Sequence, residues 1–379
     1  MKITALIAAL LALAVAASGS AATAKKNGRI VFSESYSGGE GYGTLYAVNA
    51  DRTGRVVLTD RATNGAWSPD GKRVLFESNR GGDEDLWTVE ADGSGLKELT
   101  FSVGRDGDAA WSPDGARIAF ESNRNNANGE DVFVMNADGT KATRLTTGTG
   151  FNGDPAWAPD GKEIAFTSDR GGSRDVWVMN DDGSSPRRLT TAPGADDNPA
   201  WSPDGRRILF DSERTEPGNV DIWSMAADGS DQQALLDSPA LDALPAYSPD
   251  GTRIAFVSER TRKNDRRVYL ANADGSNVRP LAASSRNGYV ASLPSWGVRP
   301  AGDACTIEGT VRDDTLLGTS HADVICGGGG TDTIRAGGGN DVIYARDGLR
   351  DFVDGGGGRD TAHLDKRDYV QRVEKKLFR

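Results

Sequence analysis

Short runs of alternating apolar and polar residues fill the chain from Arg29 to Val298, and tight-turn signals separate them. In the run from Arg117 to Glu121 the alternation has a period of two residues, which is typical of a β-strand. The runs are too short for helices. In the turn Ser-Pro-Asp-Gly at 112–115, proline fixes φ at the second position and glycine tolerates a positive φ at the last. The pattern predicts an all-β region built from hairpins.

One unit of this pattern repeats along the chain. Its copies begin at Trp67, Trp111, Trp157, Trp201 and Tyr247, at intervals of 44, 46, 44 and 46 residues. Each copy contains four short strands. A four-stranded unit of this size buries its faces only by stacking on neighbouring units around an axis. The repeat therefore predicts a β-propeller.

The number of blades is inferred from the two ends of the repeat region. The stretch from Arg29 to Thr59 contains the second, third and fourth strands of a unit but no first strand. Residues 293–297 resemble a first strand, with Trp296 in the aromatic position, and no further strands of the unit follow. We expect these two pieces to share one blade, so that the propeller has six. Joining both ends in one sheet also removes exposed strand edges.

The turn sequences of these units resemble those of a known family. Trp-Ser-Pro-Asp-Gly at 67–71, 111–115 and 201–205, and Trp-Ala-Pro-Asp-Gly at 157–161, are similar to the WD40-like (PD40) repeats of TolB-type propellers. The resemblance covers about 270 residues. It implies a TolB-like propeller, which agrees with the six blades counted from the ends of the repeat.

A second repeat follows residue 303, where the composition changes to glycine and aspartate with a period near nine. Each repeat has an aspartate followed two positions later by an apolar residue, and the aspartates are Asp314, Asp323, Asp332, Asp341, Asp351 and Asp360. The best copies, 327–332 and 337–341, resemble the RTX (haemolysin-type) nonapeptide G-G-x-G-x-D-x-U-x. The resemblance implies a short parallel β-roll.

The same resemblance implies that the roll binds Ca²⁺, because this hard cation prefers carboxylate and carbonyl oxygens. The ligands that it implies are Asp314, Asp323, Gly328, Gly330, Asp332, Gly337, Gly339, Asp341 and Asp360. The copy around Asp351 lacks the paired glycines and has one extra residue, so Asp351 is left out of this set. The basic end of the chain, from Tyr369 to Phe378, is expected to cap the roll.

The charge and the first residues indicate where the protein works. The net charge of -11 argues against a nucleic-acid partner, because binding to phosphates requires a basic face. Lys2, the apolar run 3–17 and the small residues Ala22 and Ala24 are typical of a cleaved export signal over residues 1–24. We expect a secreted or cell-envelope protein with no membrane span in the mature chain. Its expected parts are a propeller (25–298), a linker (299–308) and the capped roll (309–379).

Cys305 and Cys326 are the only cysteines in the chain. In an oxidising compartment they could pair in a disulfide. The alternative is two independent small apolar side chains, since sequence alone does not give their geometry.

Polar side chains recur at one position before the first strand of several units. Asn64, Asp108, Asp154 and Asn198 stand three residues before the aromatic residue, and Leu244 and Leu293 take this place in the other two units. We expect a protein or an extracellular ligand to bind at the variable loops of this face. The polar ring could hold a cation or a cationic side chain. Alternatively, its members satisfy backbone N–H groups of the loops.

A recurring arginine precedes an aspartate in four units. Arg80, Arg124, Arg170 and Arg214 stand five to seven residues before Asp85, Asp131, Asp175 and Asp221. We expect each arginine to form a salt bridge with the aspartate that follows it.

The sequence of the propeller lacks the residues of nucleophilic catalysis. Both histidines and both cysteines of the chain lie after residue 298, and no G-x-S-x-G motif occurs. The sequence therefore predicts a non-catalytic binding scaffold. The alternative is a secreted carbohydrate-active hydrolase or lyase that uses carboxylates at the rim of the propeller.

Overall fold

The computed structural model describes residues 27–36, 42–52, 54–125, 129–148, 150–216, 218–261, 265–281, 289–291, 293–298, 305, 307–309 and 312–378. The predicted export signal, residues 1–24, lies outside the described residues, as does most of the predicted linker. Every regular element in the described ranges is a β-strand. Within these ranges, no helix has the length and apolar character needed to cross a membrane.

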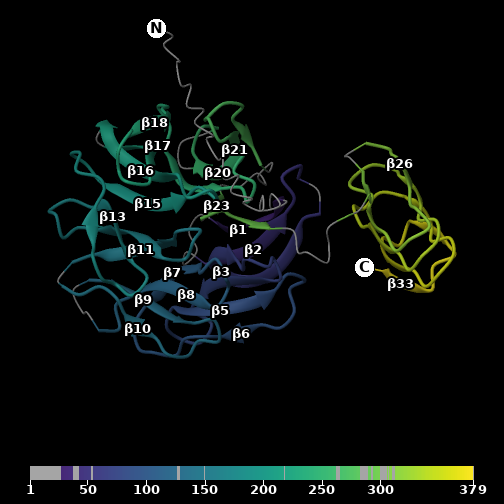
Figure 1. Cartoon of the computed structure of the whole chain (residues 1–379), viewed down its shortest axis with the longest axis horizontal. Coiled ribbons are helices and arrows are strands. Elements are labelled where there is room, and N and C mark those ends of the chain that lie inside the picture. Colours follow the sequence, from purple (N-terminus) through teal and green to yellow (C-terminus); the bar gives the residue numbers. More distant parts are fainter. Residues whose placement is uncertain are drawn as a thin grey trace, which may run out of the picture.

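The N-terminal region folds into antiparallel sheets arranged around a common centre, as a propeller (Figure 1). Four separate sheets have four strands each, and in each of them the strands pair in chain order. They are β7 (Asp106–Trp111), β8 (Arg117–Ser122), β9 (Asp131–Asn136) and β10 (Thr143–Arg144); β11 (Asn152–Trp157), β12 (Glu163–Ser168), β13 (Asp175–Asn180) and β14 (Arg187–Arg188); β15 (Asp196–Trp201), β16 (Arg207–Glu216), β17 (Asn219–Ala226) and β18 (Gln233–Leu236); β19 (Asp242–Tyr247), β20 (Arg253–Ser258), β21 (Arg267–Asn272) and β22 (Arg279–Pro280).

A larger sheet of eight strands contains both ends of the propeller region. Its strands are β1 (Asn27–Tyr36), β2 (Gly43–Val48), β3 (Val56–Trp67), β4 (Arg73–Ser78), β5 (Asp85–Glu90), β6 (Lys97–Glu98), β23 (Tyr289–Ala291) and β24 (Ser295–Val298). β24 pairs with β1, with Trp296 opposite Ile30, which confirms the prediction that Trp296 joins the sheet of Arg29. The long β3 pairs with β2 up to Ala62 and with β4 from Thr63 onward.

Equivalent phenylalanines from the second strand of each unit form the core between the sheets. Phe32, Phe76, Phe120, Phe166, Phe210 and Phe256 are all fully buried. Phe120 packs in one cluster with Leu75 and Leu99 of the preceding sheet. Burying a side chain of this size stabilises the fold by about 1.5–3 kcal/mol. The sheets therefore hold one another in place, as the repeat pattern predicts.

The Ser-Pro-Asp-Gly turns repeat one set of hydrogen bonds. In the copy at 112–115, the Ser112 hydroxyl donates to Asp114 Oδ1 at 2.6 Å, and the same oxygen accepts the Ala116 N–H at 3.0 Å. Gly115 has a φ of +70°, which a residue with a Cβ rarely adopts. The residues that the sequence places in this turn are therefore the ones its geometry requires.

The recurring arginines have partners that differ from the predicted ones. Arg124 Nη2 lies 2.5 Å from Asp106 Oδ2 and Arg214 Nη2 lies 2.7 Å from Asp196 Oδ2, so the predicted pairs with Asp131 and Asp221 are wrong. Each guanidinium lies over the ring of a core phenylalanine and also bonds to a serine hydroxyl of its strand, as Arg214 does with Ser212. These contacts turn the arginine back toward the start of the first strand, away from the aspartate that follows in sequence.

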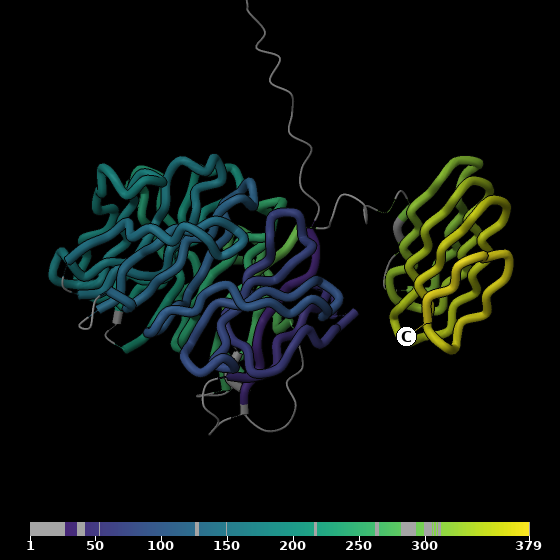
Figure 2. Tube along the Cα trace, turned by 90° about the horizontal axis from the view of Figure 1, so that it is seen from below, coloured from purple at the N-terminus to yellow at the C-terminus, as the bar shows by residue number. Residues whose placement is uncertain are grey.

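The C-terminal region is a solenoid of two parallel sheets, and its coils stack from green to yellow in Figure 2. One sheet contains β25 (Ile307–Glu308), β27 (Val324–Cys326), β29 (Val342–Ala345), β31 (Thr361–Leu364) and β33 (Lys375–Phe378). The other contains β26 (Thr315–Leu317), β28 (Thr333–Arg335), β30 (Phe352–Asp354) and β32 (Tyr369–Gln371). The apolar residues predicted to point inward form its core: Leu316, Ile325, Ile334, Ile343, Val353 and Ala362.

Candidate functional site

The polar positions at the mouth of the propeller lie in β-bulges of the first strands. Asn64, Asp108, Asp154 and Asn198 have φ values of 45°, 40°, 50° and 53°, and each lies at a shift in strand register. Asparagine and aspartate tolerate this left-handed conformation better than most residues. Leu244 adopts it as well, with a φ of 58°. The backbone geometry thus explains why short polar side chains occur at these positions.

Acidic residues of the second strands bind the backbone of these bulges across the boundary between sheets. Glu77 of β4 accepts the Asp108 N–H at 2.6 Å, and Glu121 of β8 accepts the Asp154 N–H at 3.3 Å. Asp211 of β16 accepts the Leu244 N–H at 2.9 Å in the same way. Each carboxylate therefore links its sheet to the next one.

The sequence analysis did not identify Glu77, Glu121 or Asp211. An acidic residue within an otherwise apolar second strand was the signal that could have found them.

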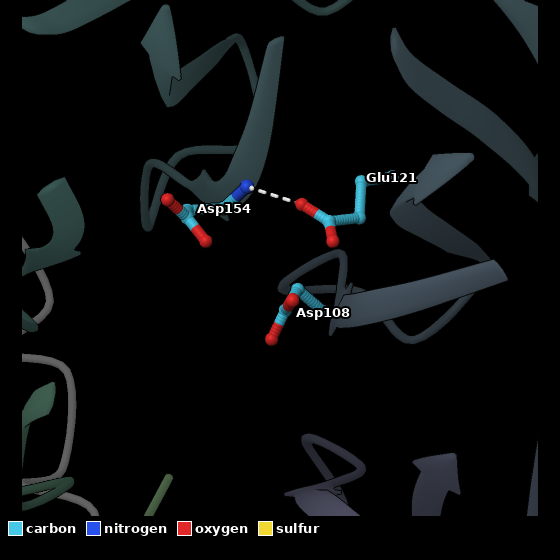
Figure 3. Close-up of side chains that lie close together, drawn as sticks. All are labelled: Asp108, Glu121 and Asp154. Atoms are coloured by element: carbon cyan, nitrogen blue, oxygen red, sulfur yellow. Dashed lines mark hydrogen bonds between the residues drawn. The ribbon is translucent and has the colours of Figure 1, made fainter. Parts of the chain in front are cut away.

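Two of the bulge aspartates converge with one of these second-strand glutamates where two neighbouring sheets meet. Asp108, Glu121 and Asp154 each place one carboxylate oxygen within 4.8 Å of the others (Figure 3). They come from β7, β8 and β11, so only the stacking of two sheets brings them together. Carboxylates at this spacing could hold a cation.

A guanidinium already occupies one side of this cluster. Arg105 Nε lies 2.5 Å from Glu84, and its terminal nitrogens lie 3.1 Å from Asp108 and 2.8 Å from Glu130. The same side chain also pairs with Glu121, and it lies 3.9 Å from Glu77. Asp154 forms no ion pair with any residue in the described ranges. Arg174, which lies 3.8 Å from Asp197, also acts on the charge of Asp154. The carboxylates around the cluster still outnumber these two arginines, which favours a further cationic group near Asp154.

Burial changes the protonation of this cluster. Burial, together with the charges of Asp108 and Asp197, raises the pKa of Asp154 to about 7. Burial and the neighbouring carboxylates raise the pKa of Glu77 and of Glu121 well above their usual range. Because a buried carboxylate without a full counter-charge is costly, these groups take up either protons or a cation.

The structure unites three of the four predicted mouth residues. Asn64 Nδ2 donates to Asp108 Oδ1 at 3.0 Å, which connects it to the cluster that contains Asp154. Asn198 instead donates to Asp211 at 2.9 Å. These two residues line a separate cavity of about 190 Å³ together with Leu244.

In the roll, one acidic residue precedes every strand from β26 to β33, and these residues form two ladders. Along one edge, Asp332 Oδ1 accepts the Asp314 N–H at 2.9 Å, and Asp351 Oδ1 accepts the Asp332 N–H at 2.8 Å. Along the other edge, Asp341 and Asp360 accept the N–H of Asp323 and of Asp341, at 2.8 and 2.9 Å. Each of these four steps joins aspartates of successive coils, 18 or 19 residues apart. The two ladders end at Asp368 and Glu374, which accept the N–H groups of Asp351 and Asp360.

The second carboxylate oxygen in four of these aspartates is buried and has no hydrogen-bond partner in the described part of the chain. These oxygens are Oδ2 of Asp332, Asp341, Asp351 and Asp360, and each residue is only 1% exposed. Burial raises the pKa of Asp332 to about 6 and of Asp351 to about 7. Buried acceptors of this kind are the ligands that a hard divalent cation requires.

The predicted ligands differ in how their oxygens are used. Asp323 Oδ2 accepts hydrogen bonds from the N–H and the hydroxyl of Thr319 in its own turn, so this oxygen is already bonded.

The predicted glycine ligands all have positive φ values, between 90° and 122°: Gly328, Gly330, Gly337 and Gly339. A Cβ on Gly330 would lie 2.4 Å from the backbone of Arg312 in the adjacent turn. Glycine is thus required for the turns to stack closely.

Cys305 and Cys326 are joined by a disulfide, with their Cα atoms 5.7 Å apart. The bond links the start of the roll to β27.

Together, the fold and these sites define a two-part protein, a β-propeller followed by a parallel roll with an aspartate ladder. Residues 45–129 and 104–299 match the TolB beta propeller domain family, and the chain belongs to that family. Residues 306–334 and 327–362 match the RTX calcium-binding nonapeptide repeat. No curated protein matches the chain in sequence.

Several solved structures share the propeller fold. TolB from Acinetobacter baumannii is 22% identical with a TM-score of 0.62; the match covers 71% of this chain and 66% of that protein. The putative TolB from Agrobacterium tumefaciens is 25% identical with a TM-score of 0.57, covering 71% of this chain and 98% of that one. Hydrazine synthase from Kuenenia stuttgartiensis is 16% identical with a TM-score of 0.59, covering 72% and 47%. The first and the third of these likenesses concern the fold alone.

Proposed function

We propose that this protein is an exported, non-catalytic binding scaffold whose C-terminal roll is ordered by calcium. The observation that carries the proposal is the set of four buried aspartate oxygens without partners, one in each of four stacked turns. Calcium would be held by Asp332, Asp341, Asp351 and Asp360 together with backbone carbonyls of the glycine turns. The ion would supply the positive charge that these buried carboxylates otherwise lack.

Calcium binding is tested by titrating the mature chain with Ca²⁺ in a calorimeter, starting from chelator-treated protein. We expect heat, and a gain of β-sheet circular dichroism at millimolar Ca²⁺ or below. Asp341→Asn should reduce the amount bound, whereas the control Asp138→Asn, in an exposed turn of the propeller, should not. Absence of both heat and spectral change would contradict the proposal.

The propeller is proposed to have six blades. The eight-stranded sheet supplies two of them if β3 is divided between Ala62 and Thr63, where its partner changes from β2 to β4. The four separate sheets supply the others. A six-fold repeat is also consistent with the six equivalent buried phenylalanines.

The propeller is proposed to bind a cationic group of a protein partner or extracellular ligand at Asp154. This rests on the excess of carboxylates around Arg105 and on the absence of an ion pair at Asp154 within the described residues. Partner capture from envelope extracts with wild-type protein, Asp154→Asn and Asp138→Asn tests it. We expect the partner to be lost, in a salt-dependent way, only with Asp154→Asn. Equal capture by both variants would contradict this site.

Export is proposed from the predicted signal over residues 1–24. The disulfide between Cys305 and Cys326 supports an oxidising compartment, where such bonds persist. Millimolar calcium is also found outside the cytoplasm rather than within it, and sites of extracellular modules are tuned to this range. A fusion of residues 1–30 to a reporter that is active only after export tests the signal.

The rival function is a carbohydrate-active hydrolase or lyase. One observation favours it: Asp154, with its pKa near 7, lies beside Asp108, as an acid and its partner carboxylate do in glycosidases. Assays on a polysaccharide panel separate the two functions. Turnover by the wild type that Asp108→Asn and Asp154→Asn abolish would establish the enzyme, and no turnover supports the scaffold.

A further inference from the structure

The turn from Arg346 to Asp351 departs from the repeat, yet its aspartate keeps its place in the ladder. Asp351 Oδ1 accepts the Asp332 N–H, and the backbone carbonyl of Asp351 accepts the Tyr369 N–H, each at 2.8 Å. The residue is 1% exposed and its Oδ2 has no partner among the described residues, like that of Asp341. The extra residue of this copy is absorbed within the turn, without moving Asp351 out of register. The expectation that excluded Asp351 from the ligands therefore loses its structural basis.

Asp347 places a second carboxylate in this turn, where the regular copies have glycine. Its Oδ1 accepts the Leu349 N–H at 2.8 Å, whereas its Oδ2 is buried and has no hydrogen-bond partner in the described ranges. Asp365 of the next coil accepts the N–H groups of Asp347 and Gly348 at 2.9 and 2.6 Å. The backbone of Asp347 is thus fixed from one side, and one of its carboxylate oxygens is left for another partner.

The neighbouring arginines do not neutralise these carboxylates. Arg346 donates to the backbone carbonyls of Leu364 and Leu377. Arg372 pairs with Asp354 on the other side of β30. Two buried carboxylate oxygens of one turn, on Asp347 and Asp351, therefore remain without a hydrogen-bond partner in the described part of the chain.

We propose that the irregular turn 346–351 is a calcium site in which Asp347 supplies a carboxylate ligand beside Asp351, in place of the missing paired glycines. This inference rests on the proposed calcium function of the roll. A regular turn offers one carboxylate and neutral carbonyls, whereas this turn offers two carboxylates. Because the affinity of a calcium site rises with the negative charge of its ligands, this site fills before the regular ones.

The test compares the mature wild-type chain with Asp347→Asn by equilibrium dialysis against Ca²⁺ and by calorimetric titration. Asparagine keeps an oxygen for the Leu349 N–H but removes the charge. We expect the tightest binding step to weaken by at least about tenfold, or to disappear with the loss of one ion per chain. Asp313→Asn is the control: its Oδ1 also accepts a backbone N–H, that of Thr331, but the residue is exposed. We expect its tightest step to change less than about twofold.

Hydrogen exchange at saturating Ca²⁺ separates a ligand from a merely structural residue. When the regular turns are filled, Asp347→Asn should keep the N–H groups of Thr333 and Val342 protected, because only its own turn loses charge. Loss of this protection in the variant at saturating Ca²⁺, or an unchanged tightest step, would overturn the inference.

Failure of this site and failure of the proposed function give different results. If Asp341→Asn lowers calcium binding and Asp347→Asn does not, only the irregular site is wrong. If the wild type binds no calcium, the proposed function itself fails.

Discussion

Removal of calcium should unfold the roll while the propeller stays folded. Without the ion, the roll contains five aspartate oxygens that are buried and lack hydrogen-bond partners among the described residues, the four of the ladders and Asp347 Oδ2. Leaving a buried polar group unsatisfied costs about 1–3 kcal/mol, so the five together cost about 5–15 kcal/mol. A folded segment as long as residues 312–378 has a free energy of unfolding of only about 3–10 kcal/mol. The cost is therefore comparable to the whole stability of the roll.

Hydrogen exchange of the full mature chain, with and without a chelator, measures this directly. The N–H groups of Thr333, Val342 and Thr361 donate to aspartate carbonyls of the neighbouring coils, so they report on the stacking of the roll. We expect them to be protected in Ca²⁺ and to exchange rapidly in chelator. Amides of the propeller, such as Ala119 in β8, serve as the internal reference and should not change. Equal protection of the roll in both conditions would refute the reasoning.

Three further predictions concern stability. Arg214→Ala leaves Asp196 buried without its ion pair and should destabilise the propeller by about 3–5 kcal/mol. The control Arg187→Ala removes an exposed pair with Glu163 and should cost less than about 1 kcal/mol. Urea denaturation of both variants checks this, and equal midpoints for the two would contradict it. Burial raises the pKa of Asp154 to about 7, so the folded propeller holds a proton that the unfolded chain releases near pH 4. The free energy of unfolding of the propeller should therefore fall as the pH rises from about 4 to about 7. Between pH 5 and pH 8, the melting temperature of Asp154→Asn should fall less than that of the wild type. An identical fall for both proteins would contradict this assignment. Replacing Cys305 and Cys326 by serine opens a link between residues 21 apart and should cost the calcium-loaded roll about 3 kcal/mol, seen as a lower melting temperature; no change would show that the bond adds no stability.

Features that follow from the composition of the repeating units were predictable. The strand of Trp296 could be assigned to the sheet of Arg29 because the first unit lacks a first strand and the last unit lacks all others. The inward position of Ile325 and Ile334 followed from their fixed distance to the aspartates of the nonapeptide. The first inference comes from counting the strands of the incomplete units, and the second from the spacing within a nonapeptide, so neither needs a contact outside the repeat pattern.

The candidate sites depend on contacts that the repeat does not encode. Sequence spacing suggested that Arg124 pairs with Asp131, but the ring of Phe120 and the hydroxyl of Ser122 direct its guanidinium to Asp106. Glu121 went unnoticed because its partner, the Asp154 N–H, belongs to the next sheet.

The strands, the turns, the two repeats and the resemblance of the roll to calcium-binding nonapeptides follow from the sequence, since each is set by side chains within one unit. The convergence of carboxylates around Arg105 and the place of Asp351 in its ladder emerge only when the sheets and coils pack together. Burial and charge at these positions come from neighbouring sheets and coils, which the repeat pattern does not specify. A side chain becomes an unsatisfied acid only when those neighbours exclude water from it.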